Sequence, residues 1–412
     1  MVGSRFLFDL MTSQGALEND NVYDTTEYAD KQATMEANVQ KWLSEVGTAE
    51  IPDTSGERDT WAANGGVSPW LVDTPTQREL TTLYNYAAAP NIVFLLVDDW
   101  GFNDAGYQSS YMSWATPNID KLASNGIKLT NYFTNNLCTP SRASLMTGRY
   151  ALRFGMHGAP DEAELPTQEV TMAEELKTAG YRTYLVGKWH LGWSSLEKTP
   201  NQRGFDYFYG YLGGHIDYWT KYFMGTNLDL NQNGVLVANE SELDSEYHSA
   251  FLFQSKVEDV IYNHATEHKS EPMFLYYAAQ LVHSDWAAPE SYKARCTSSE
   301  ELNELEKTYL TYCAMNLMLD EVVGNLTCAL QQNHMADNTV IILASDNGGY
   351  AAMPGNNYPY RGSKGTLSRG GDSVPAFVYA PNSLMPKSMR GTEYAGQMHV
   401  TGKFFLIVFS AG

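Results

Sequence analysis

Four predicted strands, each followed within a few residues by polar side chains, constrain the fold of this chain more than any other feature. They occupy residues 91–97, 181–186, 273–279 and 339–343. The continuous apolar run at 91–97 is typical of a strand buried on both faces, as in a parallel sheet. Because helix-like segments separate the four strands, the sequence predicts an α/β chain with a doubly wound, mostly parallel sheet flanked by helices.

Helical periodicity fills much of the remaining chain. Helices are predicted at residues 117–125, 171–179, 250–268 and 302–332, and further strands at 127–133 and 374–379. The stretch 201–247 is rich in aromatic residues, Gly and Asn and has no long periodicity, so we expect it to build loops over a site. His215 lies in this stretch and is a candidate substrate contact, although a structural role is the more common one for a lone histidine.

Chemically active side chains lie within a few residues of the end of each of the four predicted strands. In open α/β sheets, ligands bind outside the carboxyl ends of the strands. We therefore expect one site at this edge of the sheet, built in chain order from Asp98, Asp99, Lys188, His190, His283, Asp346 and Asn347.

A cysteine begins a helix-compatible segment at residues 138–149. Pro140 suits a helix start and Gly148 a helix end, so Cys138 is expected at a helix N-terminus. The backbone N–H groups there favour an anion and lower a thiol pKa. A buried structural cysteine is the competing interpretation.

The segment 138–149 resembles the signature of the type I sulfatases, Cys-x-Pro-Ser-Arg followed by Leu-x-Thr-Gly-Arg. Three further segments resemble that family in the same order, at residues 97–101, 187–192 and 345–349. The resemblance spans roughly residues 90–400 and is closest to the arylsulfatase B-like branch. It implies the alkaline-phosphatase-like form of the α/β fold.

The resemblance also implies an activity and its cofactors. It implies a sulfuric ester hydrolase acting on an aryl sulfate or a sulfated glycan, such as a glycosaminoglycan or another polysaccharide. Its nucleophile would be the hydrate of formylglycine, which a formylglycine-generating enzyme makes from Cys138. One Ca²⁺ ion would be bound by Asp98, Asp99, Asp346, Asn347 and the modified Cys138.

The residue types agree with these implied roles. An oxygen-only set suits a hard cation, although Asp-Asp and Asp-Asn-Gly-Gly also form ordinary turns. By resemblance, Lys188 and Lys364 bind the sulfate. Arg142 lies within two helical turns of Cys138 and is placed to stabilise the hydrate and the charge of the metal site. His190 would assist deprotonation of the hydrate and His283 would protonate the leaving alcohol, as imidazoles titrating near neutrality can. Surface lysines and structural histidines are the competing interpretations.

The net charge of −21, from 27 basic and 48 acidic residues, argues against a nucleic-acid partner. An anionic substrate then requires a locally cationic site on an acidic background. No apolar run reaches the roughly 18 residues that a membrane-spanning helix needs.

Three cysteines remain besides Cys138, namely Cys296, Cys313 and Cys328, so at most one disulfide forms among them and one thiol is left. Asn239 and Asn325 begin glycosylation sequons. Residues 1–16 show no secretory signal, whereas the resemblance implies the secretory pathway, with a lysosomal or extracellular destination.

The chain is expected to have four parts. Residues 1–46 would form a small α+β appendage that resembles the C-terminal tail of a sulfatase, and 47–90 a linker. Residues 91–401 would be the catalytic domain, and 402–412 an atypical tail where the usual C-terminal subdomain is missing. One hypothesis is that the chain joins the tail of one sulfatase unit to the head of a second, or that its gene model is mis-assembled.

Two other functions compete with sulfate ester hydrolysis. One is a phosphatase or phosphodiesterase of the same superfamily, which would use a Ser or Thr nucleophile and two zinc ions bound by His and Asp. The other is a truncated, non-catalytic sulfatase-like protein that binds glycans.

Overall fold

The computed structural model describes residues 89–158, 163–296, 303–350 and 354–402. The expected appendage at 1–46, almost all of the linker and the tail beyond residue 402 lie outside these residues. Among the described helices, none has the length and apolar character that crossing a bilayer would require.

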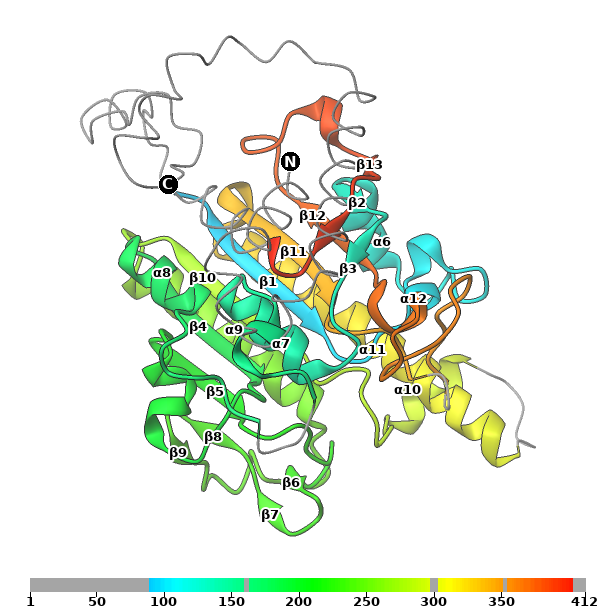
Figure 1. Ribbon diagram of the computed structural model, residues 1–412, viewed down its shortest axis with the longest axis horizontal. Helices are drawn as coiled ribbons and strands as arrows, with labels where there is room; N and C mark the ends of the chain where they lie inside the picture. Colours follow the sequence, from blue (N-terminus) through cyan, green and yellow to red (C-terminus); the bar gives the residue numbers. More distant parts are fainter. Residues whose placement is uncertain (1–88, 159–162, 297–302, 351–353, 403–412) are drawn as a thin grey trace, which may run out of the picture. The chain divides into compact units, whose positions relative to one another are not determined.

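A ten-stranded sheet forms the centre of the described chain (Figure 1). Its five middle strands are parallel and follow the order β11 (Thr339–Ser345), β1 (Asn91–Val97), β10 (Met273–Ala278), β4 (Arg182–Lys188) and β5 (Tyr207–Tyr211). Outside β11 lie β12 (Ala376–Tyr379), β2 (Ile127–Leu129) and β13 (Thr392–Tyr394). Outside β5 lie β8 (Asn231–Gln232) and β9 (Val235–Leu236). The prediction of a mostly parallel α/β sheet is confirmed.

The four strands predicted at residues 91–97, 181–186, 273–279 and 339–343 are β1, β4, β10 and β11 of this sheet. Every residue of β1 and of β10 is buried. Val97 at the end of β1 is paired with Ser345 at the end of β11, so the residues that follow the two strands begin at the same level.

Two segments depart from the sequence-based expectation, and a third forms the expected strand in a direction that the sequence did not predict. The segment 127–133 divides into β2 and β3 (Tyr132–Phe133), and β3 pairs with β14 (Met398–His399) in a separate sheet. The strand expected at 374–379 is β12, which runs antiparallel to β11. The stretch 201–247 is not only loops, because β5 extends the parallel sheet and β6 (Tyr222–Phe223) pairs with β7 (Asn227–Leu228). Pairing with β4 makes β5 a strand, and no periodicity signals that contact.

Helices cover both faces of the sheet. The odd residues of β1, such as Val93 and Leu95, share a core with α6 (Pro117–Ser124), α9 (Ser249–Glu267) and α11 (Glu304–Gln332). The even residues, such as Phe94 and Leu96, pack with α7 (Cys138–Thr147) and α8 (Met172–Thr178). Alternating side chains of one buried strand therefore supply two hydrophobic cores.

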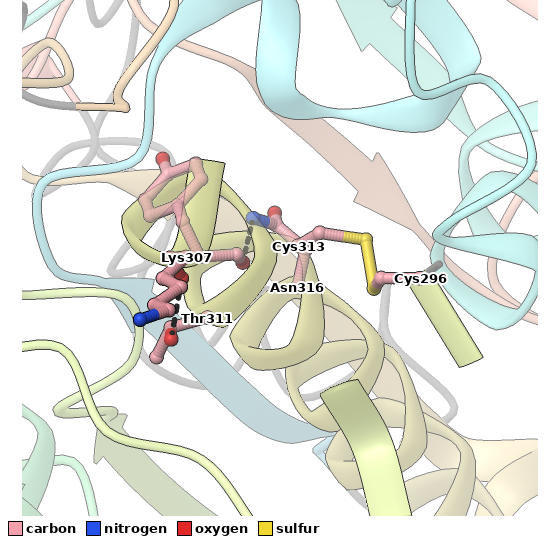
Figure 2. The surroundings of a disulfide bond; sticks show 6 residues. Cys296, Lys307, Thr311, Cys313 and Asn316 are labelled. Atoms are coloured by element: carbon pink, nitrogen blue, oxygen red, sulfur yellow. Dashed lines mark hydrogen bonds between the residues drawn. A yellow bond between two sulfur atoms is a disulfide. The ribbon is translucent and has the colours of Figure 1, made fainter. Parts of the chain in front are cut away.

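A disulfide joins Cys296, at the end of α10 (Glu290–Cys296), to Cys313 in α11 (Figure 2). Cys328 is exposed and has a free thiol. This pairing was left open by the sequence. One turn of α11 beside Cys313 supports the loop after β1, since Tyr312 donates a hydrogen bond to Asp104 and Asn316 accepts one from the Trp100 indole.

Candidate active site

Side chains from four strand ends and one helix meet at the carboxyl edge of the parallel strands. Asp98 and Asp99 follow β1, Asp346 and Asn347 follow β11, and Lys188 ends β4. The remaining candidates are His190 just beyond β4, His283 beyond β10, Cys138 and Arg142 on α7, and Lys364 in the segment after β11. Hydrogen bonds, ion pairs and electrostatic interactions connect these ten residues.

The β1 and β11 ends are tied directly to each other. The backbone N–H of Asp99 donates to Asp346 Oδ1 at 3.2 Å, and Asn347 Nδ2 donates to Asp99 Oδ1 at 2.8 Å. Asp99 adopts a left-handed backbone conformation, with φ of 58°. This uncommon conformation for a non-glycine residue turns the chain sharply at the strand end.

Three cationic side chains contact these carboxylates. Lys188 Nζ lies 2.8 Å from Asp98 Oδ2, and Lys364 Nζ lies 2.7 Å from Asp99 Oδ2. Arg142 Nη2 lies 2.8 Å from Asp346 Oδ2 and 3.4 Å from Asp98 Oδ2. The side chains of Arg142, Lys188, Asp98 and Asp346 are all fully buried. The three cations balance the three carboxylates of Asp98, Asp99 and Asp346, so a net positive charge for binding an anion requires a further cation.

Burial and charge act in opposite directions on the Asp98 carboxyl. Burial raises its pKa, but the charges of Lys188, His283, Arg142 and Lys364 together lower the pKa below its ordinary value. For Asp346, burial and the neighbouring Asp98 carboxylate raise the pKa, and Arg142 opposes them. Two carboxylates this close favour an additional cation, because each raises the cost of ionising the other.

Cys138 is the first residue of α7 and is buried. Burial raises the pKa of its thiol, but Lys188 and His190 lower it well below the ordinary value. The helix ends at Gly148 in a left-handed conformation with φ of 66°, as its sequence predicts. The unmodified cysteine thus lies where an anion is stabilised by both the helix N-terminus and nearby cations.

The two histidines of the cluster have different neighbours. His190 lies beside Cys138 and Thr139, and the Thr139 hydroxyl is 3.2 Å from its Nε2. His283 Nε2 lies 3.2 Å from Lys364 Nζ and 3.6 Å from Asp99 Oδ2. One imidazole is therefore next to the cysteine, and the other is next to the lysine that contacts Asp99.

The oxygen atoms of the cluster fit a divalent cation. Within the part of the chain that the structure describes, the buried atoms Asp98 Oδ1 and Asn347 Oδ1 have no hydrogen-bond partner. Buried acceptors are rarely left unsatisfied, so these two atoms are suited to bind a cation. Ligand atoms of Asp98, Asp99 and His283 also lie within 4.8 Å of one another. Carboxylate and amide oxygens suit Ca²⁺ or Mg²⁺ better than a thiolate-binding metal.

Sequence reasoning missed the buried residues that hold the site in place. The Tyr218 hydroxyl lies 3.0 Å from the Gln280 carbonyl oxygen and 2.9 Å from that of His283. Tyr218 and Gln280 are both buried, and Gln280 accepts a hydrogen bond from Ser249. No motif or periodicity signals these contacts, because they connect a loop, a strand end and a helix start far apart in the sequence.

The fold and the site together define a class of protein. A parallel α/β sheet that gathers carboxylates, lysines and a helix N-terminus at one edge is suited to hydrolysing esters of tetrahedral anions. The fold is similar to the crystal structure of the phosphonate monoester hydrolase of Agrobacterium radiobacter, with a TM-score of 0.55 and 18% identity over 76% of this chain and 72% of that chain. It is the α/β fold of the alkaline-phosphatase-like hydrolases.

Within this class, the chain belongs to the sulfatase family, whose family model, described as Sulfatase, matches residues 90–405. It is 38% identical to arylsulfatase J of Mus musculus over 322 residues, which cover 76% of this chain. The chain spans 51% of that relative, about half its length. It is also similar to the crystal structure of Ps i-CgsB in complex with k-i-k-neocarrahexaose, with a TM-score of 0.70, 28% identity and coverage of 79% of this chain and 72% of that chain. Family membership implies a formylglycine residue and a metal ion.

Proposed function

We propose that this chain is a Ca²⁺-dependent sulfuric ester hydrolase whose nucleophile is made from Cys138. The observation that carries the proposal is the meeting of the Asp98, Asp99, Asp346 and Asn347 side chains at one sheet edge beside Cys138 at a helix N-terminus. Residues 91–401 would form the catalytic domain, which agrees with the family match to 90–405.

Formylglycine, when formed, supplies a geminal diol of which one hydroxyl attacks sulfur and the other allows sulfate to leave as the aldehyde re-forms. Ca²⁺ would be held by Asp98, Asp99, Asp346 and Asn347, where it would neutralise charge on the sulfate and the attacking hydroxyl. The unpartnered oxygens of Asp98 and Asn347 support this ligand set.

The remaining polar residues bind the anion and move protons. Lys188 and Lys364, next to the carboxylates, would hold sulfate oxygens as compact cations. His190, beside Cys138, would accept a proton from the diol. His283 Nε2 lies next to Lys364 and Asp99. His283 would donate a proton to the leaving alcohol oxygen as the bond between that oxygen and sulfur breaks. Arg142 would fix Asp346 and offset part of the negative charge of the carboxylates.

The relatives support a sulfated glycan as the substrate class. Sulfatases similar to this chain include N-acetylgalactosamine-6-sulfatase of Homo sapiens, at 29% identity over 72% of this chain. A sulfated glycan is therefore the natural substrate that we propose, with aryl sulfates as synthetic substrates. The disulfide between Cys296 and Cys313 supports a route through the oxidising secretory pathway, where a formylglycine-generating enzyme would modify Cys138.

The test is to express the chain together with a formylglycine-generating enzyme and to analyse the peptide that contains residue 138 by mass spectrometry. We expect the mass decrease of cysteine-to-aldehyde conversion, together with release of 4-nitrophenol from 4-nitrophenyl sulfate. Cys138→Ala should keep the fold and lose this activity. Turnover of 4-nitrophenyl phosphate in preference to the sulfate would support a phosphatase instead, and a modified but inactive chain would support a glycan-binding protein.

A further inference from the structure

We propose that His215 contacts the alcohol part of the substrate, the sugar ring that leaves after sulfate transfer, and so helps to select it. This inference rests on the proposed function. His215 lies in the loop between β5 and β6, and its ring stacks on that of His283. The ring centroids are 5.8 Å apart and the ring planes differ by 18°. Since His283 would protonate the leaving oxygen, the group attached to that oxygen must pass close to the neighbours of His283.

Exposure to solvent increases from the charged cluster toward His215. The Lys188 and Asp98 side chains are fully buried, and that of His283 is 11% exposed. His215 is half-buried, whereas its neighbours Gly214 and Ile216 are buried. His215 therefore lies on the open side of the candidate site, where the larger part of a substrate must remain while its sulfate reaches the buried cations.

The loop that carries His215 is held in one arrangement. The His215 ring also lies close to that of Phe223, with centroids 5.4 Å apart. At the start of the loop, Asp229 accepts hydrogen bonds from the backbone N–H groups of Leu212 and Gly213. At its end, the buried Lys221 ammonium donates to three backbone carbonyls. An imidazole fixed in this way loses little conformational freedom when it binds a ligand.

Buried hydrogen bonds also couple this loop to His283. The Tyr218 hydroxyl contacts the carbonyl oxygens of Gln280 and His283, and the Gln280 side-chain amide donates to the carbonyl of Ile216. The Tyr218 side chain is fully buried. Because these bonds join the loop just after His215 to the segment after β10, the two imidazoles keep their stacked positions together.

The chemistry of this position suits a sugar better than a simple aryl group. Imidazole can donate and accept hydrogen bonds, and its neighbour Phe223 offers an apolar ring face. Sugar hydroxyls and the C–H face of a pyranose match both features. The 4-nitrophenyl group has no hydroxyl to pair with His215, so His215 should matter less for 4-nitrophenyl sulfate.

The experiment compares two substrates on the full chain with residue 138 converted to formylglycine. The values of kcat/KM are measured for 4-nitrophenyl sulfate and for the best substrate in a panel of carrageenan and chondroitin sulfate oligosaccharides. We expect His215→Ala to lower kcat/KM about tenfold for the oligosaccharide, the typical effect of one lost hydrogen bond. The loss for 4-nitrophenyl sulfate should be much smaller. His215→Gln, which keeps hydrogen-bonding capacity, should restore part of the loss.

The matched control is His268→Ala. His268 caps the end of α9, shortly before β10 begins, and therefore lies toward the opposite edge of the sheet from the site. It should leave both substrates unaffected. An equal loss of kcat/KM on both substrates for His215→Ala would mean that His215 only supports His283. No loss of kcat/KM on either substrate would mean that His215 does not contact the substrate. Each of these two results overturns the inference.

A binding measurement separates this inference from the proposed function. The dissociation constants of the same oligosaccharides are measured by calorimetry for the Cys138→Ala variant, with and without the further substitution His215→Ala. About tenfold weaker binding by the double variant supports the contact even if the modified wild-type chain releases no sulfate, and unchanged binding overturns it. Absence of sulfate release from the modified wild-type chain would instead refute the proposed function.

Discussion

The Arg142 guanidinium contacts a single oxygen of Asp346 through two nitrogen atoms, with Nε at 3.1 Å and Nη2 at 2.8 Å. Both side chains are fully buried. The pair joins the first turns of α7 to the end of β11, and so connects the helix that presents Cys138 to the strand that presents the oxygen cluster. Removing one partner leaves the other charge buried without compensation.

Arg142→Met should therefore lower both stability and activity. Breaking a buried ion pair by removing one partner typically costs roughly 3–5 kcal/mol of unfolding free energy. The matched control is Arg149→Met, just beyond the same helix, where the pair with Glu169 is at the surface and is worth at most about 1 kcal/mol. Urea unfolding of both variants measures the difference. Equal losses for the two variants would contradict the assignment of a structural role to the buried pair.

Removal of divalent cations should lower the melting temperature and sulfate release together. A cation at about 100 times its Kd would stabilise the native chain by about 2.7 kcal/mol. Thermal melting after EDTA treatment, and again after addition of CaCl₂ or MgCl₂, tests this effect and the choice of metal. Asn347→Ala removes one unpartnered oxygen and should weaken the response to Ca²⁺. A melting temperature that changes with neither chelator nor Ca²⁺ would exclude a metal at this cluster.

Loss of the disulfide should destabilise the chain without removing any proposed catalytic group. Cys296 and Cys313 are separated by 17 residues, and closing a loop of this length stabilises a native state by about 3 kcal/mol in the chain-entropy account. The double variant Cys296→Ser with Cys313→Ser should show this loss in chemical unfolding. Cys328→Ser, which changes the exposed free thiol, is the control and should have wild-type stability.

The stability of the chain should depend on pH through His248. Burial lowers the pKa of this histidine to about 4, although a hydrogen bond to the Ala287 carbonyl opposes the shift. Between about pH 6.5 and 4 the ring binds a proton in the unfolded chain and not in the native one. Its contribution is therefore complete above about pH 6.5 and is lost as the pH falls toward 4, by up to roughly 3 kcal/mol.

His248→Asn tests this pH dependence. His248 caps α9 by accepting a hydrogen bond from the backbone N–H of Ala250, and Asn can cap a helix without titrating. We expect the variant to lose less unfolding free energy than the wild type between about pH 7 and pH 4.5, even if it is less stable at neutral pH through loss of the stacking on Tyr218. Parallel pH profiles for the two proteins would show that His248 is not the group responsible.

The strand framework could be predicted from the sequence, but several pairings could not. The strand predicted at 91–97 has the same first and last residues as β1. The prediction succeeds because the apolar composition of the strand reflects its burial on both faces of the sheet. In contrast, β5 lies in a stretch without periodicity, and only its pairing with β4 makes it a strand. The antiparallel direction of β12 likewise could not be predicted from its own residues, because direction depends on where the chain returns to the sheet.

The sequence by itself determined the chemistry available at the site: carboxylates after β1 and β11, a lysine at the end of β4, and a cysteine in a family-specific signature. These features are local, since they depend on residue types and on burial along one strand or helix. Only the tertiary structure decided which lysine contacts which aspartate, which cysteines pair and that His215 stacks on His283. Those contacts join segments far apart in the chain, and the packing of the whole sheet and its helices, rather than any local pattern, brings them together.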